Sequence, residues 1–137
     1  MEVSTDPERL DVELIHHWLS TDAYWALGRT REVVERAVSG SLNWGAYDGA
    51  GRQVGYARVV TDRATFAWLC DVYVDPAVRG QGVGTALLDA VTAQLAGYRL
   101  KRVLLATEDA HAVYERYGFR PLPDPSLFMA SGEPAAG

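Results

Sequence analysis

The sequence predicts an α/β (α+β) fold in a single domain, and three observations support this. First, 137 residues are enough to bury one hydrophobic core, and no repeat or linker divides residues 1–137. Second, apolar residues recur at helical spacing in four segments, which are 11–19, 30–38, 84–96 and 110–117. Third, runs rich in β-branched and aromatic residues predict strands at 43–47, 53–61, 65–74 and 102–106.

The composition of the chain narrows the classes of function. Hydrophobic residues make up 48% of the chain and charged residues 23%, as in ordinary globular proteins. The net charge of −5 argues against a nucleic-acid partner and weakly favours a cationic or amine substrate. The single cysteine suggests a reducing compartment, and no apolar run reaches the roughly 20 residues of a membrane span. We therefore expect a cytoplasmic protein with no membrane partner.

The N-terminal third predicts a helix, an aromatic loop and a second helix, which together could cover a pocket. Residues 1–10 are a lead-in or an edge segment, and residues 23–29 form the loop. Thr30 is expected to cap the second helix and Gly40 to end it. The residues of this helix expected to face inward are Val33, Val34, Ala37 and Val38.

Turn residues define the elements of the middle of the chain. Asp48 to Gly51 predicts a hairpin. In the strand that follows, one face is expected to carry Val54, Tyr56, Arg58 and Val60. Gly97 is expected to break the third helix, and the strand at 102–106 to be compact and buried.

The C-terminal part predicts a short helix followed by strands. Asp109 is expected to cap the helix and Gly118 to end it. Phe119 should begin another strand, and residues 127–129 should form a last edge strand. Residues 131–137 are small and are expected to form a frayed, flexible tail.

The stretch from Leu69 to Leu88 joins a buried strand, a glycine turn and a helix start. In Arg79-Gly-Gln-Gly-Val-Gly84, three glycines stand at alternate positions. Such a turn leaves free backbone N–H groups at a helix N-terminus, where the helix dipole favours an anion, most naturally phosphate. A dinucleotide fingerprint would need a glycine where Thr85 stands, and a nucleoside triphosphate loop would need a lysine before this threonine.

What remains resembles the acetyl-coenzyme A loop of small bacterial members of the GNAT superfamily of N-acetyltransferases. That loop reads Arg/Gln-x-x-Gly-x-Gly/Ala, and Arg79, Gly82 and Gly84 match it in register. Residues 106–119 are similar to the superfamily's C-terminal motif, a strand and a helix followed by Tyr-x-x-x-Gly-Phe. The resemblance implies a central mixed, mostly antiparallel sheet flanked by about four helices. It also implies that the strands at 65–74 and 102–106 splay apart and admit the cofactor.

The resemblance further implies which residues bind acetyl-CoA. The strand before the glycine loop should pair through its backbone with the pantetheine arm, and the loop amides should bind the pyrophosphate. The residues implied at the cofactor are Val72, Tyr73, Val74, Arg79, Gly80, Gln81, Gly82, Val83, Gly84, Thr85, Asp109, His111 and Tyr117.

Two residues are candidates for catalysis. Tyr114 stands where the superfamily places its general acid, which protonates the leaving thiolate. Asp71 is the candidate for the general base or the ammonium ligand, and the alternative is a structural carboxylate bonded to backbone or to an arginine. Many members carry a glutamate one position earlier, where this chain has Cys70. We expect Cys70 to belong to the core rather than to carry an acyl group.

The segment expected to cover the acceptor is aromatic. An aromatic wall suits a cation or a planar group, and an arginine there could bind a substrate carboxylate. The predicted substrate-binding residues are His16, Tyr24, Trp25 and Arg29. Neighbouring histidines on a helix point about 100° apart, so we expect no metal site at His16 and His17.

The resemblance implies an acetyl-CoA-dependent N-acetyltransferase that acts on a primary amine of a small molecule or peptide. Transfer would be direct, in a ternary complex, with coenzyme A as product. A transferase of a different acyl group and an acetyl-CoA-binding sensor without turnover stay open as alternatives. The acceptor is open among polyamines, aminoglycosides, amino acids and protein lysines. Because members of the superfamily commonly dimerise, a homodimer is open as well.

Overall fold

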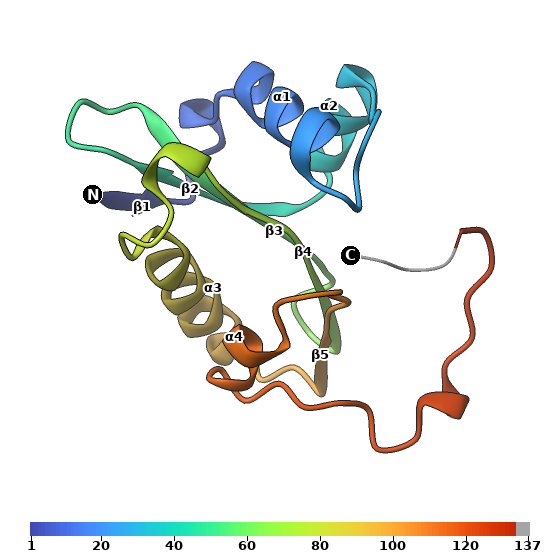
Figure 1. Cartoon of the computed structure of the whole chain (residues 1–137). Coiled ribbons are helices and arrows are strands. Elements are labelled where there is room, and N and C mark those ends of the chain that lie inside the picture. The colour runs from blue at the N-terminus through green and yellow to red at the C-terminus, as the bar shows by residue number, and fades with distance from the viewer. Residues whose placement is uncertain (134–137) are drawn as a thin grey trace.

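A five-stranded sheet forms the centre of the computed structural model, which describes residues 1–133 (Figure 1). The strands lie side by side in chain order, as β1 (Glu2–Ser4), β2 (Leu42–Tyr47), β3 (Gln53–Thr61), β4 (Phe66–Val74) and β5 (Arg102–Leu104). Neighbouring strands are antiparallel, except β4 and β5, which are parallel. The predicted mixed, mostly antiparallel sheet is therefore confirmed.

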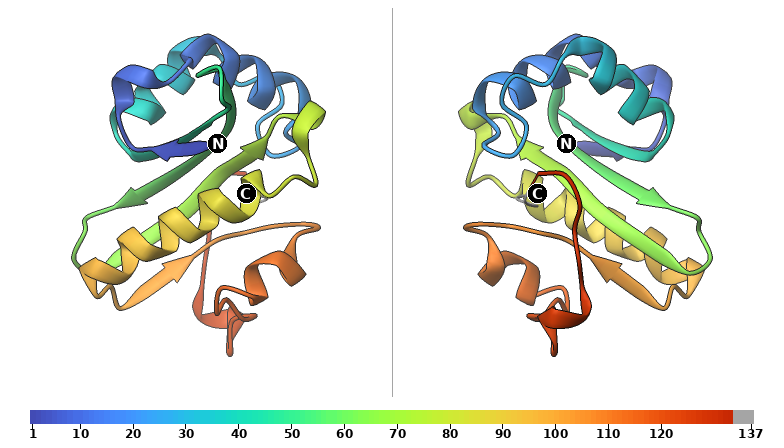
Figure 2. Two further views of the ribbon diagram at one scale, coloured as in Figure 1. Left: turned by 90° about the vertical axis from the view of Figure 1, so that its left-hand side faces the viewer. Right: turned by 90° about the vertical axis from the view of Figure 1, so that its right-hand side faces the viewer.

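Helices cover both faces of the sheet (Figures 1 and 2). On one face lie α1 (Val12–Asp22) and α2 (Arg31–Ser39), and on the other lie α3 (Val83–Tyr98) and α4 (His111–Glu115). Single turns of 3-10 helix occur at Pro7–Arg9, Pro76–Val78 and Pro125–Leu127. Within residues 1–133, none of the helices combines the length and the apolar character needed to cross a membrane.

Each face of the sheet has its own hydrophobic cluster. On the α3 face, Leu87 and Val91 are buried against the strands. A Cβ at Gly55 of β3 would lie 2.9 Å from both Leu87 Cδ1 and Val83 Cγ1, so glycine permits the close approach of α3. On the opposite face, α1 and α2 pack against the sheet around Tyr56 and Tyr73.

A β-bulge interrupts the pairing of β3 with β4. Tyr56 lies opposite Tyr73, but Arg58 lies opposite Cys70, so β4 contains one residue more than β3 between these pairs. Asp71 lies in the bulge with φ 52°, a left-handed conformation that few non-glycine residues adopt. The bulge reverses the alternation of side chains along β4.

The prediction that one face of β3 carries Val54 together with Tyr56 is wrong. The register of β2 with β3 shifts beside Val54, which packs in the α3 cluster, whereas Tyr56 packs with α1 and α2. The prediction that Val33 faces inward is also wrong, because its side chain is 39% exposed. The predicted caps of this helix are confirmed, since Thr30 accepts from the Val33 N–H and Gly40 follows the last residue.

Two expectations about helix ends are also wrong. Gly97 does not break α3, which continues to Tyr98 and ends at Arg99, a residue in the left-handed conformation with φ 55°. Asp109 does not cap α4, because the Thr107 hydroxyl accepts hydrogen bonds from the N–H groups of Asp109 and Ala110. Gly118 follows the last turn with φ 90°, as its prediction required.

The C-terminal strands are the largest departure from the prediction. The strand expected at 102–106 is only three residues long and is not fully buried. Neither Phe119 nor residues 127–129 belong to a strand in the described part of the chain. Of the predicted tail, residues 134–137 lie outside the described residues.

Gly97→Ala should stabilise the protein by about 0.5–1 kcal/mol, because Gly97 lies inside α3 and a Cβ at this position would have no neighbouring atom within 4 Å. Gly55→Ala should instead destabilise it, because its Cβ would clash with α3 side chains. Urea unfolding of both variants checks this. A loss of stability in Gly97→Ala would contradict the helical position of this residue.

Candidate active site

β4 and β5 separate after three paired residues. Their pairing runs from Phe66 and Arg102 to Trp68 and Leu104, whereas β4 continues to Val74. The predicted splay between these strands is therefore confirmed. Beyond Trp68, the side of β4 that faces away from β3 has no strand partner within residues 1–133. Backbone groups on that side can pair with a bound molecule.

The alternation of hydrogen bonds along β4 identifies these backbone groups. The Asp75 N–H donates to the Val54 carbonyl at 2.9 Å, which places residue 75 in a hydrogen-bonded pair with β3. Residues 72 and 74 then direct their backbone groups away from β3, into the opening. The Val74 carbonyl already accepts a hydrogen bond from Arg79 Nε at 3.0 Å. Of these two residues, Val72 is therefore the one whose N–H and C=O can both pair with a bound molecule.

The glycine loop supplies an uncapped helix N-terminus beside this opening. Gly80 and Gly82 adopt left-handed φ values of 80° and 89°, and no side chain caps α3. The first N–H groups of the helix therefore have no acceptor within it. No atom lies within 4 Å of a Cβ built at either glycine, so the approach to these donors is open. Convergent donors and the helix dipole suit a phosphate.

Arg79 connects the glycine loop to the end of α1. Its Nη2 lies 3.2 Å from Asp22 Oδ2, and its guanidinium carbon lies 5.1 Å from the centre of the Tyr73 ring. The Tyr73 hydroxyl donates to the same Asp22 carboxylate. These contacts fix the position of the loop relative to the helices on the other face of the sheet.

Tyr114 extends from α4 to the opening, and its ring packs edge-on against Phe119 at 5.9 Å between centroids. Burial, together with the proximity of Tyr24, Asp109 and Cys70, raises the pKa of Tyr114 to about 12. The phenol therefore stays protonated near neutral pH. A protonated, half-buried phenol can donate a proton or a hydrogen bond to a group in the opening.

Asp71 lies in a buried polar cluster that occupies both of its carboxylate oxygens. Trp25 Nε1 donates to Oδ1, and Arg29 Nη1 and Arg58 Nε donate to Oδ2, each at 2.8 Å. Burial alone would raise the pKa of Asp71, but the charges of Arg58 and Arg29 and these hydrogen bonds lower it. A proton on Asp71 would weaken two partly buried ion pairs. The contacts therefore favour the structural alternative over the role of general base.

The predicted substrate-binding residues meet around this cluster. Trp25 and Arg29 bind Asp71 directly, and His16 Nε2 lies 3.1 Å from the Arg29 carbonyl. The Tyr24 hydroxyl accepts from the Glu108 N–H at 2.8 Å, which joins the α1–α2 loop to the β5–α4 loop. All four residues belong to α1 or the α1–α2 loop.

Arg58 is a member of the cluster that the sequence analysis did not assign to the site. It lies on β3, its Nε binds Asp71, and its Nη1 donates to Ser41 Oγ at 3.0 Å. A charged residue within an otherwise apolar strand was the available signal. Cys70, beside Asp71, is buried, and burial raises the pKa of its thiol to about 11, which agrees with a place in the core.

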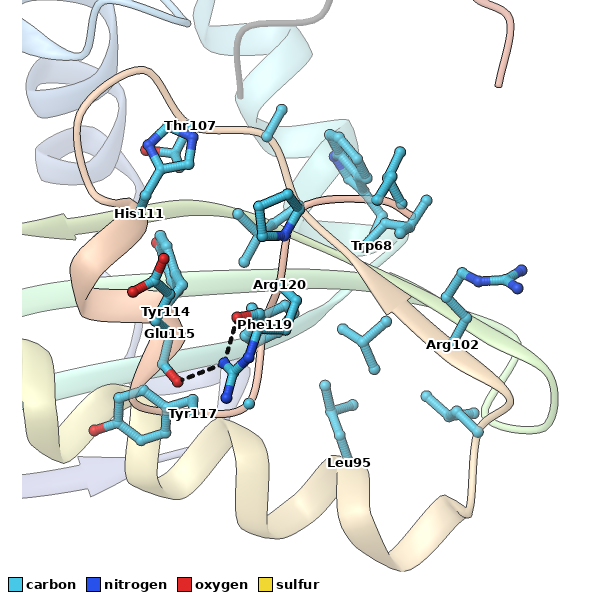
Figure 3. A pocket seen from close by; sticks show the side chains of 18 of the residues that line it. Trp68, Leu95, Arg102, Thr107, His111, Tyr114, Glu115, Tyr117, Phe119 and Arg120 are labelled. Carbon is cyan, nitrogen blue, oxygen red and sulfur yellow. Dashed lines mark hydrogen bonds between the residues drawn. The ribbon is translucent and has the colours of Figure 1, made fainter. Parts of the chain in front are cut away.

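The remaining cofactor candidates lie in α4 or in the loops on either side of it. His111 and Tyr114 line a cavity of about 1000 Å³ together with Thr107 (Figure 3). Asp109 is exposed in the loop before the helix. Tyr117 lies in the turn after α4, and its hydroxyl donates to Asp89 Oδ1 at 2.9 Å, so it joins this turn to α3.

Asp71→Asn should destabilise the fold by roughly 2–4 kcal/mol at pH 7, because the partly buried guanidinium groups of Arg29 and Arg58 lose their charged partner. Folding lowers the pKa of Asp71, so its stabilisation is present above the unfolded pKa of about 3.9 and is lost as pH falls through the folded value. Urea unfolding at pH 7 and below pH 4 should show the two proteins converging only in acid. The exposed Asp109→Asn serves as control, and equal stability of Asp71→Asn at pH 7 would contradict the cluster.

Comparison with known sequences places the site in a family. Residues 39–121 match the family model of the acetyltransferase (GNAT) domain. A protein of Gibberella zeae, provisionally named an acetyltransferase, is 35% identical over 126 residues, and the match covers 78% of this chain and 71% of that protein. The chloroplastic serotonin N-acetyltransferase 2 of Oryza sativa subsp. japonica is 32% identical over 103 residues, with 74% of this chain and 52% of that protein covered.

Solved structures agree with the sequence comparison. A protein from Xanthomonas campestris pv. campestris, provisionally assigned to the GNAT family, has a TM-score of 0.93 and 47% identity, and 97% of this chain and 93% of that chain align. A structure from Mycobacterium tuberculosis in complex with CoA shares the fold at a TM-score of 0.70 and 24% identity, with 90% of this chain and 76% of that chain covered. Because the family model spans more than half of the sequence, this chain belongs to the GNAT acetyltransferase family.

Proposed function

We propose that this chain is an acetyl-CoA-dependent N-acetyltransferase that acts on a primary amine of a small molecule or peptide. The observation that supports this most directly is the opening between β4 and β5, which lies between the uncapped α3 N-terminus and the protonated phenol of Tyr114. An anion site, unpaired strand backbone and an acid at one opening fit a phosphate-bearing thioester.

The chain offers a matching group for each part of acetyl-CoA, which when bound supplies the activated acetyl thioester. The loop amides from Gly80 to Thr85 would bind the pyrophosphate. The Val72 backbone would pair with the pantetheine amides, as a strand partner would. Tyr114 would face the sulfur.

In the proposed reaction the amine nitrogen attacks the thioester carbonyl carbon, and the carbon–sulfur bond breaks. Tyr114 donates its proton to the leaving sulfur, and the nitrogen loses a proton to water. Arg58, Asp71 and Arg29 lie close enough to Cys70 on β4 to change the pKa of its thiol. Together these three groups carry a net charge of +1. A positive environment lowers the pKa of a nearby ammonium, so it favours the neutral, nucleophilic amine without a side-chain base.

Acetyl-CoA should bind the purified protein, and calorimetric titration measures this. Gly84→Glu should bind about 10-fold more weakly than Gly84→Gln, because the added carboxylate would lie at the N–H groups that the pyrophosphate needs. Both side chains fit, since a Cβ at Gly84 lies 3.7 Å from Val74 Cγ2 and φ is not left-handed. Equal affinities of the two variants would refute an anion site, and no binding to the unmodified protein would refute the loop assignment.

Tyr114→Phe should lower kcat by about 100-fold, because the leaving thiolate loses its proton donor, while the Kd for acetyl-CoA changes less than about twofold. A free-thiol assay over polyamines, amino acids, peptides and arylalkylamines measures turnover. The arylalkylamines are included because of the similarity to serotonin N-acetyltransferase 2. Tyr98→Phe, which removes a hydroxyl bonded to Gln94 on α3, is the matched control. Normal kcat in Tyr114→Phe would refute its acid role, and binding without thiol release from any amine would favour the sensor.

A further inference from the structure

The cavity of about 1000 Å³, which we call the β5 cavity, runs along the whole of β5 (Figure 3). Its walls are β5, the second half of α3, α4, and residues 121–123 and 128–130 of the segment that follows α4. The lining is mainly apolar and includes Trp68, Leu95 and Phe119 (Figure 3). A hollow of this size, lined by apolar side chains with a few polar groups, is typical of a site for a small molecule.

The β5 cavity is separate from the anion site at the start of α3 but meets the active site at Tyr114. Within residues 1–133, its lining passes from Trp68 directly to Thr92, so it includes neither the glycine loop nor the first turns of α3. Tyr114 lines the cavity and also lies near Cys70, which follows the last β4–β5 pair. Direct transfer needs two ligands that meet at the acid, and the cavity offers the second ligand a place of its own.

The charges around the β5 cavity disfavour an acceptor with several cations. Arg99, Arg102 and Arg120 line it, whereas Glu115 is its one acidic lining residue in the described part of the chain. Arg120 is fixed in place, since its Nη1 donates to the Phe119 carbonyl at 2.8 Å and to the Glu115 carbonyl at 3.1 Å. A second ammonium group would meet these guanidinium groups at close range. A single amine on an uncharged body therefore fits better than a polyamine or an aminoglycoside.

Apolar side chains at the rim of the β5 cavity are open to water. Phe128 and Met129 both line the cavity, and they are 43% and 97% exposed. The Arg102 guanidinium carbon lies 6.0 Å from the centre of the Phe128 ring, so this ring is held beside β5. An apolar ligand in the cavity would cover these side chains and be stabilised by removing them from water.

We propose that the β5 cavity binds the apolar body of an acceptor that carries one primary amine. This inference rests on the proposed function, because it names the acceptor class of the same reaction. The amine would lie at the Tyr114 end of the cavity, where Thr107 and His111 also lie (Figure 3). The apolar body would lie between β5 and residues 128–130.

A free-thiol assay with acetyl-CoA and the n-alkylamines from ethylamine to hexylamine measures the contribution of the apolar body. KM should fall about three- to fourfold for each added methylene, because each methylene leaves water for the cavity. Spermidine, which carries several cations, should give a kcat/KM at least about 100-fold below that of hexylamine. A KM that stays constant along the series, or equal turnover of spermidine and hexylamine, would overturn the proposal.

Phe128→Gln should raise the KM for hexylamine about 10-fold, because it replaces an apolar wall with a polar side chain and adds no charge. The Kd for acetyl-CoA should change less than about twofold, since Phe128 is remote in sequence from the glycine loop and lines only the cavity. Leu127→Gln is the matched control, because Leu127 is 76% exposed and is not among the residues that line the cavity. Equal KM values in the two variants would contradict the proposed position of the acceptor.

Calorimetric titration of hexylamine into the protein saturated with coenzyme A measures acceptor binding without turnover. Binding that Phe128→Gln weakens and Leu127→Gln does not would support the cavity as the amine site. If no amine then released thiol, the proposed function alone would be refuted. Thiol release with spermidine or a peptide, without binding of hexylamine, would instead overturn the acceptor proposal and leave acetyl transfer in place.

Discussion

The conformation of Asp71 is the constraint on which the geometry of the site depends. A left-handed backbone at a non-glycine residue costs on the order of 1–3 kcal/mol. Three hydrogen bonds to the Asp71 carboxylate, two of them from guanidinium groups, offset this cost. The bulge that results reverses the alternation along β4, so Tyr73 packs with α1 while the Val72 backbone faces the opening. Without the cluster around Asp71, β4 would lose the bulge that distinguishes it from an ordinary strand.

Polar contacts hold the α1–α2 segment against β4 and the loops that border the opening. Trp25 and Arg29 fix the α1–α2 loop to β4 through Asp71. Tyr24 connects the same loop to the β5–α4 loop, and Asp22 connects the end of α1 to the glycine loop. The two hydrophobic clusters lie on opposite faces of the sheet. The polar contacts are thus the link between the helices over one face and the loops that border the opening.

The sequence was informative where structure depends on neighbours in the chain and uninformative where it depends on distant ones. The strand, glycine turn and helix between Leu69 and Leu88 were predicted because positive φ values and a helix start are local properties. An arginine was named as an alternative partner of Asp71, but which arginines was not predicted, since Arg58 is 13 residues away and Arg29 is 42 residues away. Gly97 stayed helical because tertiary packing of α3 outweighs the weak propensity of one glycine. Residues 127–129 have a strand pattern but form no strand in the described residues, because a strand requires a neighbouring strand to pair with.

The distribution of charge suggests how the proposed reaction could separate binding from deprotonation. The chain carries a net charge of −5, which attracts an ammonium ion over distances of about a Debye length, roughly 10 Å. At the opening the sign changes, because the α3 N-terminus lies on one side and the Arg29–Asp71–Arg58 cluster, of net charge +1, on the other. An ammonium drawn by the acidic surface would lose its proton as it approaches this region. The same positive groups would stabilise negative charge that develops on the carbonyl oxygen and the sulfur. A base would then be unnecessary, and Asp71 would serve catalysis by keeping two arginines in place.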